Sequence, residues 1–233
     1  VEKDDASRGY SAAVLNKLAK YVPHLIGGSA DLGPANKSNM KARGEFLPDD
    51  KSGSNMHFGI REHAMSAIVN GMYLHGGLIP YCATFAVFSD YMKPAVRMAA
   101  LMELPVKFIW THDAFRVGED GPTHEPVEQE AQIRLMEKLK NHKGHNSTLV
   151  LRPADAKETT EAWALAMANT ATPTALILSR QNIKDLPEGN AYAEAAKGAY
   201  IVAGSDSNPD VILVASGSEV STLFAATELL ESR

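Results

Sequence analysis

The regular alternation of short apolar runs with amphipathic segments is the feature that most limits how this chain can fold. The apolar runs are LIGG, LIPYCATF, VKFIWTHD, STLVLRPA and TALILSRQN, and the segments between them carry Leu, Ala and Met at helical spacing. Such alternation is typical of βαβ units, whose strands pair in parallel and are covered by helices. The sequence therefore predicts an α/β fold with a mostly parallel sheet flanked by helices.

Helices are predicted over residues 7–22, 61–76, 88–102 and 157–170. Asp155 has the side chain and the position of an N-cap for the last of these. Pro94 fits a helix only in a first turn or at a kink, so the third helix is expected to begin after Phe85 and to bend near Met92.

The chain changes character near residue 186. Residues 182–198 are polar, contain Pro and Gly and have no clear period, as a linker would. Beyond them, residues 199–204 and 210–218 are predicted strands and residues 219–233 a predicted helix. We therefore divide the chain into residues 1–186 and residues 187–233, the second part being the start of another α/β unit. One βα step cannot cover both faces of a sheet, so this part is expected to lean on the first domain or to belong to a longer polypeptide.

Composition excludes several classes of protein. A net charge of -5 offers no basic field for nucleic acid. No apolar run reaches the roughly 20 residues of a membrane span, and the N-terminus lacks the apolar core of a secretory signal. Because Cys82 is the only cysteine, no internal disulfide is possible and a cytoplasmic setting is expected.

An acid, Glu62, lies between Arg61 and His63 at the head of an otherwise apolar helix. It could be an ordinary carboxylate stabilised by the N-terminal helix dipole. If it is buried, it could instead share a proton with a ligand nitrogen, because desolvation and the dipole act on it in opposite directions. Both interpretations stand on the residues alone.

Phe85, Phe88 and Tyr91 recur every three residues, so they would share one side of a helix. Such a stripe usually packs in a core. Its position after a predicted strand also suits a slot for a planar ligand, since α/β proteins bind ligands at strand ends.

The loop over residues 111–128 is dense in polar side chains, namely His112, Arg116, Glu119, Asp120, His124 and Glu125. It is either a solvated loop or a place of proton transfer and hydroxyl binding. The spacing of its histidines and acids matches no strong metal signature, so no metal site is predicted.

Arg8, Arg152 and Arg180 each lie at the end of a predicted element. They could form surface ion pairs, or together bind an anion such as phosphate. GGSADLG lacks the lysine and hydroxyl of a nucleotide-binding phosphate loop, so nucleotide binding is not expected.

Six motifs together resemble transketolase in order and approximate spacing: GGSADL, FGIREHAM, ATFAVFSDY, THDAFRVGEDGPTHEP, RPAD and SRQN. The resemblance covers residues 8–182, as the pyrimidine-binding middle domain, and continues into the start of the C-terminal domain. It implies an enzyme that transfers a two-carbon ketol group from a ketose phosphate to an aldose phosphate in the pentose phosphate pathway.

The resemblance also implies roles for the residues that bind the cofactor, thiamine diphosphate. Glu62 would hydrogen-bond a ring nitrogen of the aminopyrimidine and relay a proton. Phe85, Phe88 and Tyr91 would enclose that ring, and Asp31 would lie near the thiazolium. Magnesium or calcium would be held by an N-terminal diphosphate-binding domain, of which this sequence has no counterpart.

For the sugar substrate, the resemblance implies that His112 and His124 contact substrate and serve catalysis. Asp120 would bind the acceptor hydroxyl beside the aldehyde, and Arg8 and Arg180 would hold the phosphate.

One position departs from the family. Many members have serine where this chain has Ala35, so a phosphate contact is lost or is supplied by Lys37 or Ser38.

The implied active site lies between the subunits of a homodimer, where the pyrimidine-binding domain of one faces the diphosphate-binding domain of the other. Because this sequence has no counterpart of the diphosphate-binding domain, the chain alone is expected to be inactive. Other possibilities remain. They are a dihydroxyacetone synthase, a deoxyxylulose phosphate synthase, or a non-catalytic dimerisation module.

Overall fold

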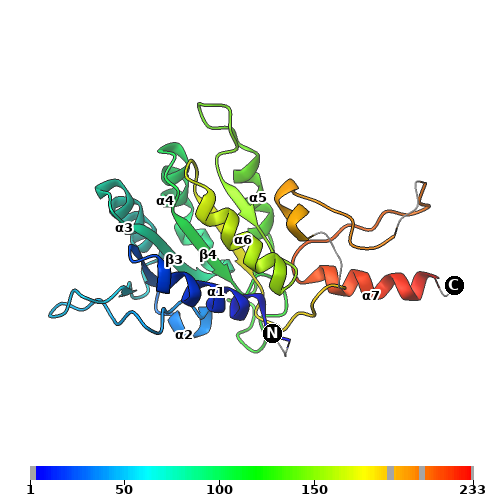
Figure 1. The fold of residues 1–233 in the computed structure, drawn as a ribbon, viewed down its shortest axis with the longest axis horizontal. Coiled ribbons are helices and arrows are strands. Elements are labelled where there is room, and N and C mark those ends of the chain that lie inside the picture. Colours follow the sequence, from blue (N-terminus) through cyan, green and yellow to red (C-terminus); the bar gives the residue numbers. More distant parts are fainter. Residues whose placement is uncertain (1–3, 188–191, 205–207, 232–233) are drawn as a thin grey trace.

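The predicted parallel sheet is present. The structure is a computed structural model that describes residues 4–187, 192–204 and 208–231. Six parallel strands form one sheet in the order β2-β1-β3-β4-β6-β5. Their bounds are β1 Leu25–Ser29, β2 Asn55–His57, β3 Ile79–Phe85, β4 Lys107–Thr111, β5 Leu149–Leu151 and β6 Thr174–Leu178. The fold is thus an α/β sheet flanked by helices, as the alternation predicts (Figure 1).

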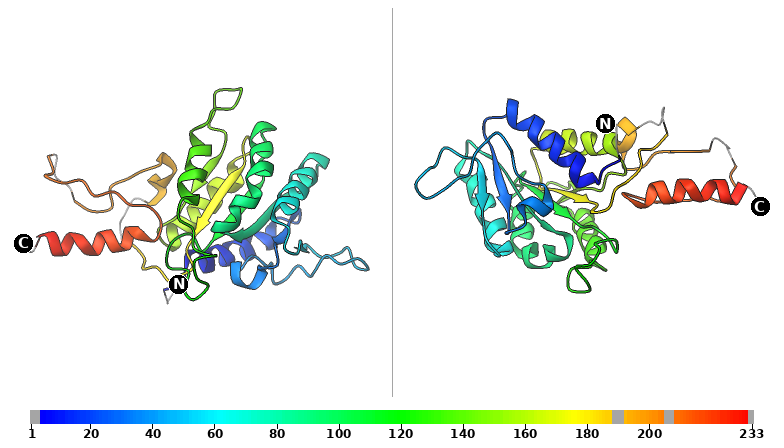
Figure 2. Two further views of the ribbon diagram at one scale, coloured as in Figure 1. Left: turned by 180° about the vertical axis from the view of Figure 1, so that it is seen from behind. Right: turned by 90° about the horizontal axis from the view of Figure 1, so that it is seen from below.

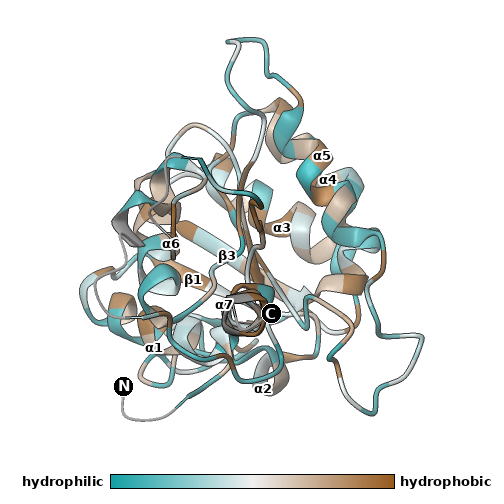
Figure 3. Cartoon of the chain, turned by 90° about the vertical axis from the view of Figure 1, so that its right-hand side faces the viewer, coloured by the Kyte–Doolittle hydropathy of each residue, from teal (hydrophilic) through white to brown (hydrophobic). Residues whose placement is uncertain are grey.

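Helices cover both faces of this sheet. One layer consists of α1 (Ser7–Tyr21) and α6 (Ala156–Ala168). The other consists of α3 (Glu62–His75), α4 (Ser89–Leu101) and α5 (Gln129–Lys138). Figure 3 shows the two layers on opposite sides of the sheet, with apolar colour concentrated between them. Because both faces are covered, the central strands are apolar along their whole length rather than alternating.

Each layer has its own core. Trp110 and Phe108 of β4 stack at 6.0 Å beneath α3, α4 and α5. On the opposite face, Trp163 of α6 packs with Tyr81, and its indole donates a hydrogen bond of 2.8 Å to Ser11 Oγ of α1. Asp155 caps α6, as predicted, by accepting from the Glu158 amide at 2.8 Å.

The start of α4 agrees with expectation, whereas two other elements were not predicted. Phe85 ends β3, and a 3-10 turn over Ala86–Phe88 leads into α4. Pro94 lies inside α4, where its missing N–H leaves one turn without its usual bond. Strand β2 and helix α5 were not predicted, because three residues show no period and α5 buries few apolar side chains.

The two strands predicted near the C-terminus are wrong. Residues 199–204 and 208–218 form no strand among the described residues, and Val211, Ile212 and Val214 are exposed. A strand requires a neighbour to accept and donate its backbone bonds, and the described residues offer none here. The predicted helix is confirmed as α7 (Glu219–Glu231), which extends away from the sheet (Figure 2).

Within the described ranges, no helix has both the length and the apolar character that crossing a membrane requires.

Candidate functional site at the carboxyl edge of the sheet

Most of the predicted site residues lie at one edge of the molecule. In a parallel sheet all strands end at the same edge, and here Phe85, His112 and Arg180 follow or end β3, β4 and β6. The helices run back against the strands, so Arg8 and Glu62 begin α1 and α3 at this same edge. The strand order reverses direction beside β1, and such a switch point is where open α/β sheets bind ligands.

Phe85, Phe88 and Tyr91 form a continuous row of rings. The Phe85 and Phe88 rings stack with centroids 6.0 Å apart and planes within 8°, and Tyr91 follows Phe88 at 6.2 Å. Phe85 is buried whereas Tyr91 is 62% exposed, so the row runs from the core to the surface. His124 contacts two of these rings edge-on, at 6.1 Å from Phe85 and 5.3 Å from Phe88. The row is therefore more than a core stripe, because part of it remains open.

His112 is the most constrained residue of the site. Its φ of 59° lies in the left-handed region, which is strained for a residue other than glycine. Its ring stacks on Phe85 at 3.7 Å, and only 3% of the residue is exposed. Burial, together with the charges of Arg8 and Arg180, lowers the pKa of His112 to about 3. The imidazole is thus neutral at physiological pH.

Two buried residues, Thr111 and Asn36, hold His112 through its Nδ1 side, and neither was predicted from the sequence. Thr111 Oγ1 lies 2.8 Å from His112 Nδ1, and the Thr111 hydroxyl donates to Asn36 Oδ1 at 2.6 Å. The Asn36 amide nitrogen in turn donates to Ser29 Oγ at 2.8 Å. Asn36 lies outside the six motifs, and Thr111 begins one of them but was given no role, because nothing local in the sequence reports this chain of bonds.

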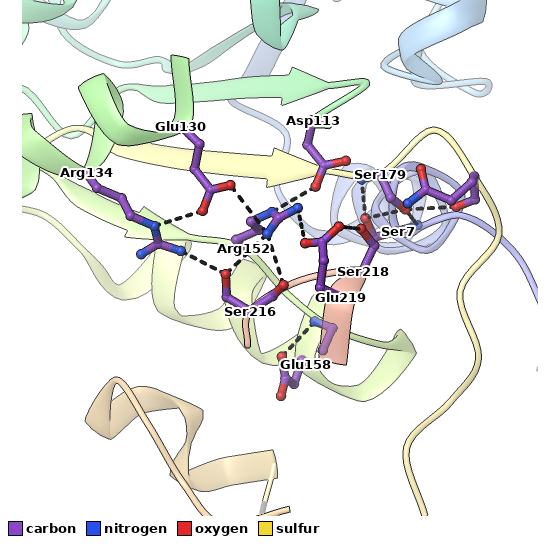
Figure 4. A network of polar contacts seen from close by, with 12 residues as sticks. Ser7, Asp113, Glu130, Arg134, Arg152, Glu158, Ser179, Ser216, Ser218 and Glu219 are labelled. Atoms are coloured by element: carbon purple, nitrogen blue, oxygen red, sulfur yellow. Dashed lines mark hydrogen bonds and ion pairs between the residues drawn. The ribbon is translucent and has the colours of Figure 1, made fainter. Parts of the chain in front are cut away.

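Arg8 and Arg180 are brought together by a pair of serines. Ser7 and Ser179, the residues that precede them, are buried and exchange hydrogen bonds from each backbone amide to the other hydroxyl, at 3.0 and 2.7 Å (Figure 4). Burial and the neighbouring charge of Arg180 lower the pKa of Arg8. An anion placed between the two guanidinium groups would relieve this repulsion.

The two arginines are not equally available. Arg8 Nη1 already donates to the Ala35 carbonyl at 2.5 Å and lies 3.3 Å from His112 Nε2. The side chain of Arg180 is 37% exposed, and its one ion pair with another described residue is a long one, 3.6 Å to the exposed Glu119. Arg180 is therefore the freer group for a ligand.

Other predicted site residues are placed at the edge without being joined to this cluster. Glu62 is 8% exposed and starts α3, and its carboxylate forms no hydrogen bond or ion pair with another described residue. Asp31 is exposed after β1 with a positive φ of 62°, and Asp120 is exposed in the loop after β4. Asp31 and Asp120 thus face solvent, whereas Glu62 is buried without a partner among the described residues.

Lys37 and Ser38 were suggested to supply the phosphate contact that a serine at position 35 would make, but Lys37 already has a partner and Ser38 is buried. Lys37 pairs with Asp5 at 3.2 Å. Ser38 is 2% exposed, and its buried hydroxyl has no hydrogen-bond partner among the described residues. Ser38 therefore does not reach a ligand at the surface, and Lys37 would have to leave Asp5 to do so.

Arg152 does not join the other arginines. Its guanidinium is buried among Asp113 at 2.9 Å, Glu130 at 3.4 Å and Glu219 at 2.5 Å, and it also donates to the Ser216 carbonyl at 3.0 Å (Figure 4). Burial alone would lower its pKa, but these carboxylates raise it. Arg152 thus ties the segment before α7 to the sheet instead of binding an anion.

No group of three or more His, Cys, Asp or Glu side chains that could hold a metal ion is found in the part of the chain that the structure describes.

Acidification is expected to destabilise the protein through His112. The pKa of an unfolded histidine is about 6.5, and that of His112 is about 3, so between these values the unfolded chain binds the extra proton. The free energy of unfolding should then fall by about 1.4 kcal/mol for each pH unit below 6. Urea unfolding at pH 7.0, 5.5 and 4.5 measures this slope.

The matched variants for this test are His112→Gln and His24→Gln. His24 is exposed, so its removal should leave the slope unchanged, whereas His112→Gln should flatten it. Equal slopes for both variants would contradict the assignment.

The fold and the site define a class of protein: a parallel α/β domain whose carboxyl edge, the usual ligand site of such sheets, carries aromatic rings, a neutral histidine and two neighbouring arginines. Comparison with known families narrows this class. The family described as "Transketolase, pyrimidine binding domain" matches residues 5–185, and "Transketolase-like TK C-terminal domain" matches residues 198–233.

Individual relatives agree with these matches. The transketolase of Halalkalibacterium halodurans is 52% identical, over 99% of this chain and 34% of its own length. A structure of Pichia stipitis transketolase, described as a complex with sedoheptulose 7-phosphate, has a TM-score of 0.89 at 41% identity, covering 100% of this chain and 34% of that one. A split-gene transketolase, described as an inactive beta4 tetramer, has a TM-score of 0.59 at 25% identity, covering 80% of this chain and 55% of that one.

The chain belongs to the transketolase family. It spans about a third of the length of the curated relatives that it matches, as the 34% share of the Halalkalibacterium halodurans protein illustrates.

Proposed function

We propose that this chain is the pyrimidine-binding part of a thiamine diphosphate-dependent transketolase, which moves a two-carbon ketol group from a ketose phosphate to an aldose phosphate. The observation that carries the proposal is the half-open row of Phe85, Phe88 and Tyr91 at the carboxyl edge of the sheet. Stacked aromatic faces suit a flat heterocycle.

The residues present fit the cofactor's pyrimidine. The ring would lie against Phe88 and Tyr91, and the Glu62 carboxylate, which has no partner among the described residues, would accept from or donate to a ring nitrogen. Asp31 would lie near the second ring. When bound, thiamine diphosphate supplies a nucleophilic carbon that side chains cannot provide.

The protein's own groups would orient the sugar. His112 is neutral, so its Nε2 can accept a hydrogen bond from a substrate hydroxyl once Arg8, which lies 3.3 Å away, turns to the sugar phosphate. His124 contacts the same rings from the loop after β4. Asp120 would bind a hydroxyl of the acceptor through its exposed carboxylate. The two histidines are the proposed proton carriers close to the reacting carbons.

The sugar phosphate would bind to Arg180 and Arg8. The guanidinium group is planar and pairs with phosphate through two hydrogen bonds. The repulsion between the two arginines supports this role, because it leaves a field that favours a dianion. Magnesium or calcium would be bound by residues outside this chain.

We also propose that the active site is completed by a second copy in a homodimer. An apolar groove of about 350 Å³ lies between α3 and α4, lined by residues that include Leu74, Pro94 and Met98. Apolar grooves of this kind commonly mark interfaces. We further propose that the chain divides into two domains at residues 1–186 and 187–233, and that the protein is cytoplasmic.

The experiment is a chimera. Residues 5–233 replace the matching segment of the Halalkalibacterium halodurans transketolase, which is 52% identical to this chain. Ketol transfer from a ketose phosphate is then measured with ribose 5-phosphate, formaldehyde or pyruvate as acceptor. Activity with ribose 5-phosphate supports the proposal.

Other products would point to the alternatives. Preference for formaldehyde would indicate a dihydroxyacetone synthase, and preference for pyruvate a deoxyxylulose phosphate synthase. A folded, dimeric chimera that does not bind thiamine diphosphate in calorimetric titration would indicate a non-catalytic module and would overturn the proposal.

A further inference from the structure

We propose that Thr111 and Asn36 are positioning residues that hold His112 in a single tautomer, with the proton on Nδ1 and the lone pair of Nε2 facing the site. The consequence for catalysis rests on the proposed function. The tautomer itself does not, and it can be measured on the 233-residue chain.

The Thr111 hydroxyl has a single proton to donate. Thr111 Oγ1 lies within hydrogen-bond distance of two groups, Asn36 Oδ1 at 2.6 Å and His112 Nδ1 at 2.8 Å. The amide oxygen of Asn36 can only accept. Thr111 must therefore donate to Asn36, and its oxygen is left to accept from His112.

The orientation of the Asn36 amide is set by a further bond. Its nitrogen donates to Ser29 Oγ at 2.8 Å, and this directs its oxygen toward Thr111. Ser29, Asn36 and Thr111 are 5%, 2% and 0% exposed, so water does not compete for these bonds. A chain of buried hydrogen bonds with one consistent direction results.

The opposite side of the ring requires the same tautomer. Arg8 Nη1 lies 3.3 Å from His112 Nε2, and a guanidinium can only donate. With a proton on Nε2, both the imidazole and the Arg8 guanidinium would be donors, and no hydrogen bond could form between them. Thr111 and Arg8, which come from different elements, thus select the same form of the imidazole.

The left-handed backbone of His112 is consistent with this role. A φ of 59° turns the ring back over the end of β4, so that it stacks on Phe85 and meets the hydroxyl of the residue before it. In the usual extended conformation, successive side chains of a strand point to opposite faces. The left-handed backbone of His112 therefore brings its Nδ1 within hydrogen-bond distance of Thr111 Oγ1.

The test is nitrogen NMR of the histidine side chains of the 233-residue chain at pH 7, comparing the wild type with Thr111→Val. Valine keeps the shape of threonine but removes the hydroxyl. We expect a protonated Nδ1 and an unprotonated Nε2 for His112 in the wild type. In Thr111→Val the resonances should move to the Nε2–H form or to averaged values.

Thr84→Val is the matched control. Thr84 is as buried as Thr111 and lies on the adjacent strand β3, and its hydroxyl has no partner in the part of the chain that the structure describes. Its replacement should leave His112 unchanged, and Thr111→Ser, which retains the hydroxyl, should restore the wild-type tautomer. A wild-type His112 protonated on Nε2, or an unchanged tautomer in Thr111→Val, would overturn the proposal.

The chimera provides the functional readout. If the tautomer orients substrate, Thr111→Val should lower kcat about tenfold or more while Thr111→Ser and Thr84→Val stay near the parent. Loss of kcat in Thr84→Val as well would show a general packing effect and would contradict the positioning role.

Discussion

Glu62→Ala in the chimera is expected to reduce ketol transfer by roughly 10² to 10⁴, because a positioned acid or base contributes about that much to proton transfer. Glu62 begins α3 at the carboxyl edge, is nearly buried and has no partner among the described residues. A carboxylate in such a place is available to a ligand nitrogen. The rate should be measured at saturating substrate and thiamine diphosphate.

The control must separate this role from helix stability. A carboxylate at a helix N-terminus stabilises it by only about 0.3–1 kcal/mol, so Glu62→Ala should remain folded. Glu45→Gln, which breaks an exposed pair with His57 at 2.7 Å, should keep full activity. If Glu62→Ala transferred ketol groups at the parent rate, its assigned role would be wrong.

Arg152→Met is expected to lower the free energy of unfolding by about 3–5 kcal/mol, the usual cost of removing one partner from a buried ion pair. Asp113 would be left with 1% of its side chain exposed and no positive charge beside it. Burial raises the pKa of Asp113, and Arg152 is the group that opposes this rise. Urea unfolding at pH 7 measures the loss.

A second measurement follows the segment that Arg152 holds. Gly217 has a φ of +59°, and a Cβ there would lie 2.7 Å from the Arg152 side chain, so residues 216–219 wrap closely around the guanidinium. Arg152→Met should therefore increase amide hydrogen exchange in residues 216–219. Glu194→Gln, which breaks an exposed pair with Lys197, should change neither quantity. A stability within about 1 kcal/mol of wild type would refute the anchoring role, since only exposed pairs are that weak.

The fold was largely predictable because its signal is periodic and local. Apolar runs bounded by polar loops predicted β1, β3, β4, β5 and β6, and the side chain and position of Asp155 predicted the start of α6. Residues 199–204 and 210–218 have the same apolar character, yet they form no strand among the described residues. Strand formation depends on a neighbouring strand, which a local pattern does not report.

The sequence named residues that lie together at one edge, but it did not predict their contacts. The motifs contain His112, His124 and Arg180, and the family resemblance added Arg8, which lies beside His112. The stacking of His112 on Phe85 and the serine pair beside the arginines were not predicted. Serines are common in surface loops, so nothing in their spacing distinguished Ser7 and Ser179.

The α/β architecture, the family and the chemical types at the site follow from the order of residues alone, because periodicity and motifs are properties of neighbouring residues. Which groups meet depends on the folded chain. Thr111 contacts Asn36 across 75 residues, and Ser7 contacts Ser179 across 172. In the folded chain Arg152 pairs with three carboxylates, whereas the Arg180 side chain remains partly exposed to solvent. These contacts arise because the order of the strands in the sheet, β2-β1-β3-β4-β6-β5, brings distant chain segments to one edge.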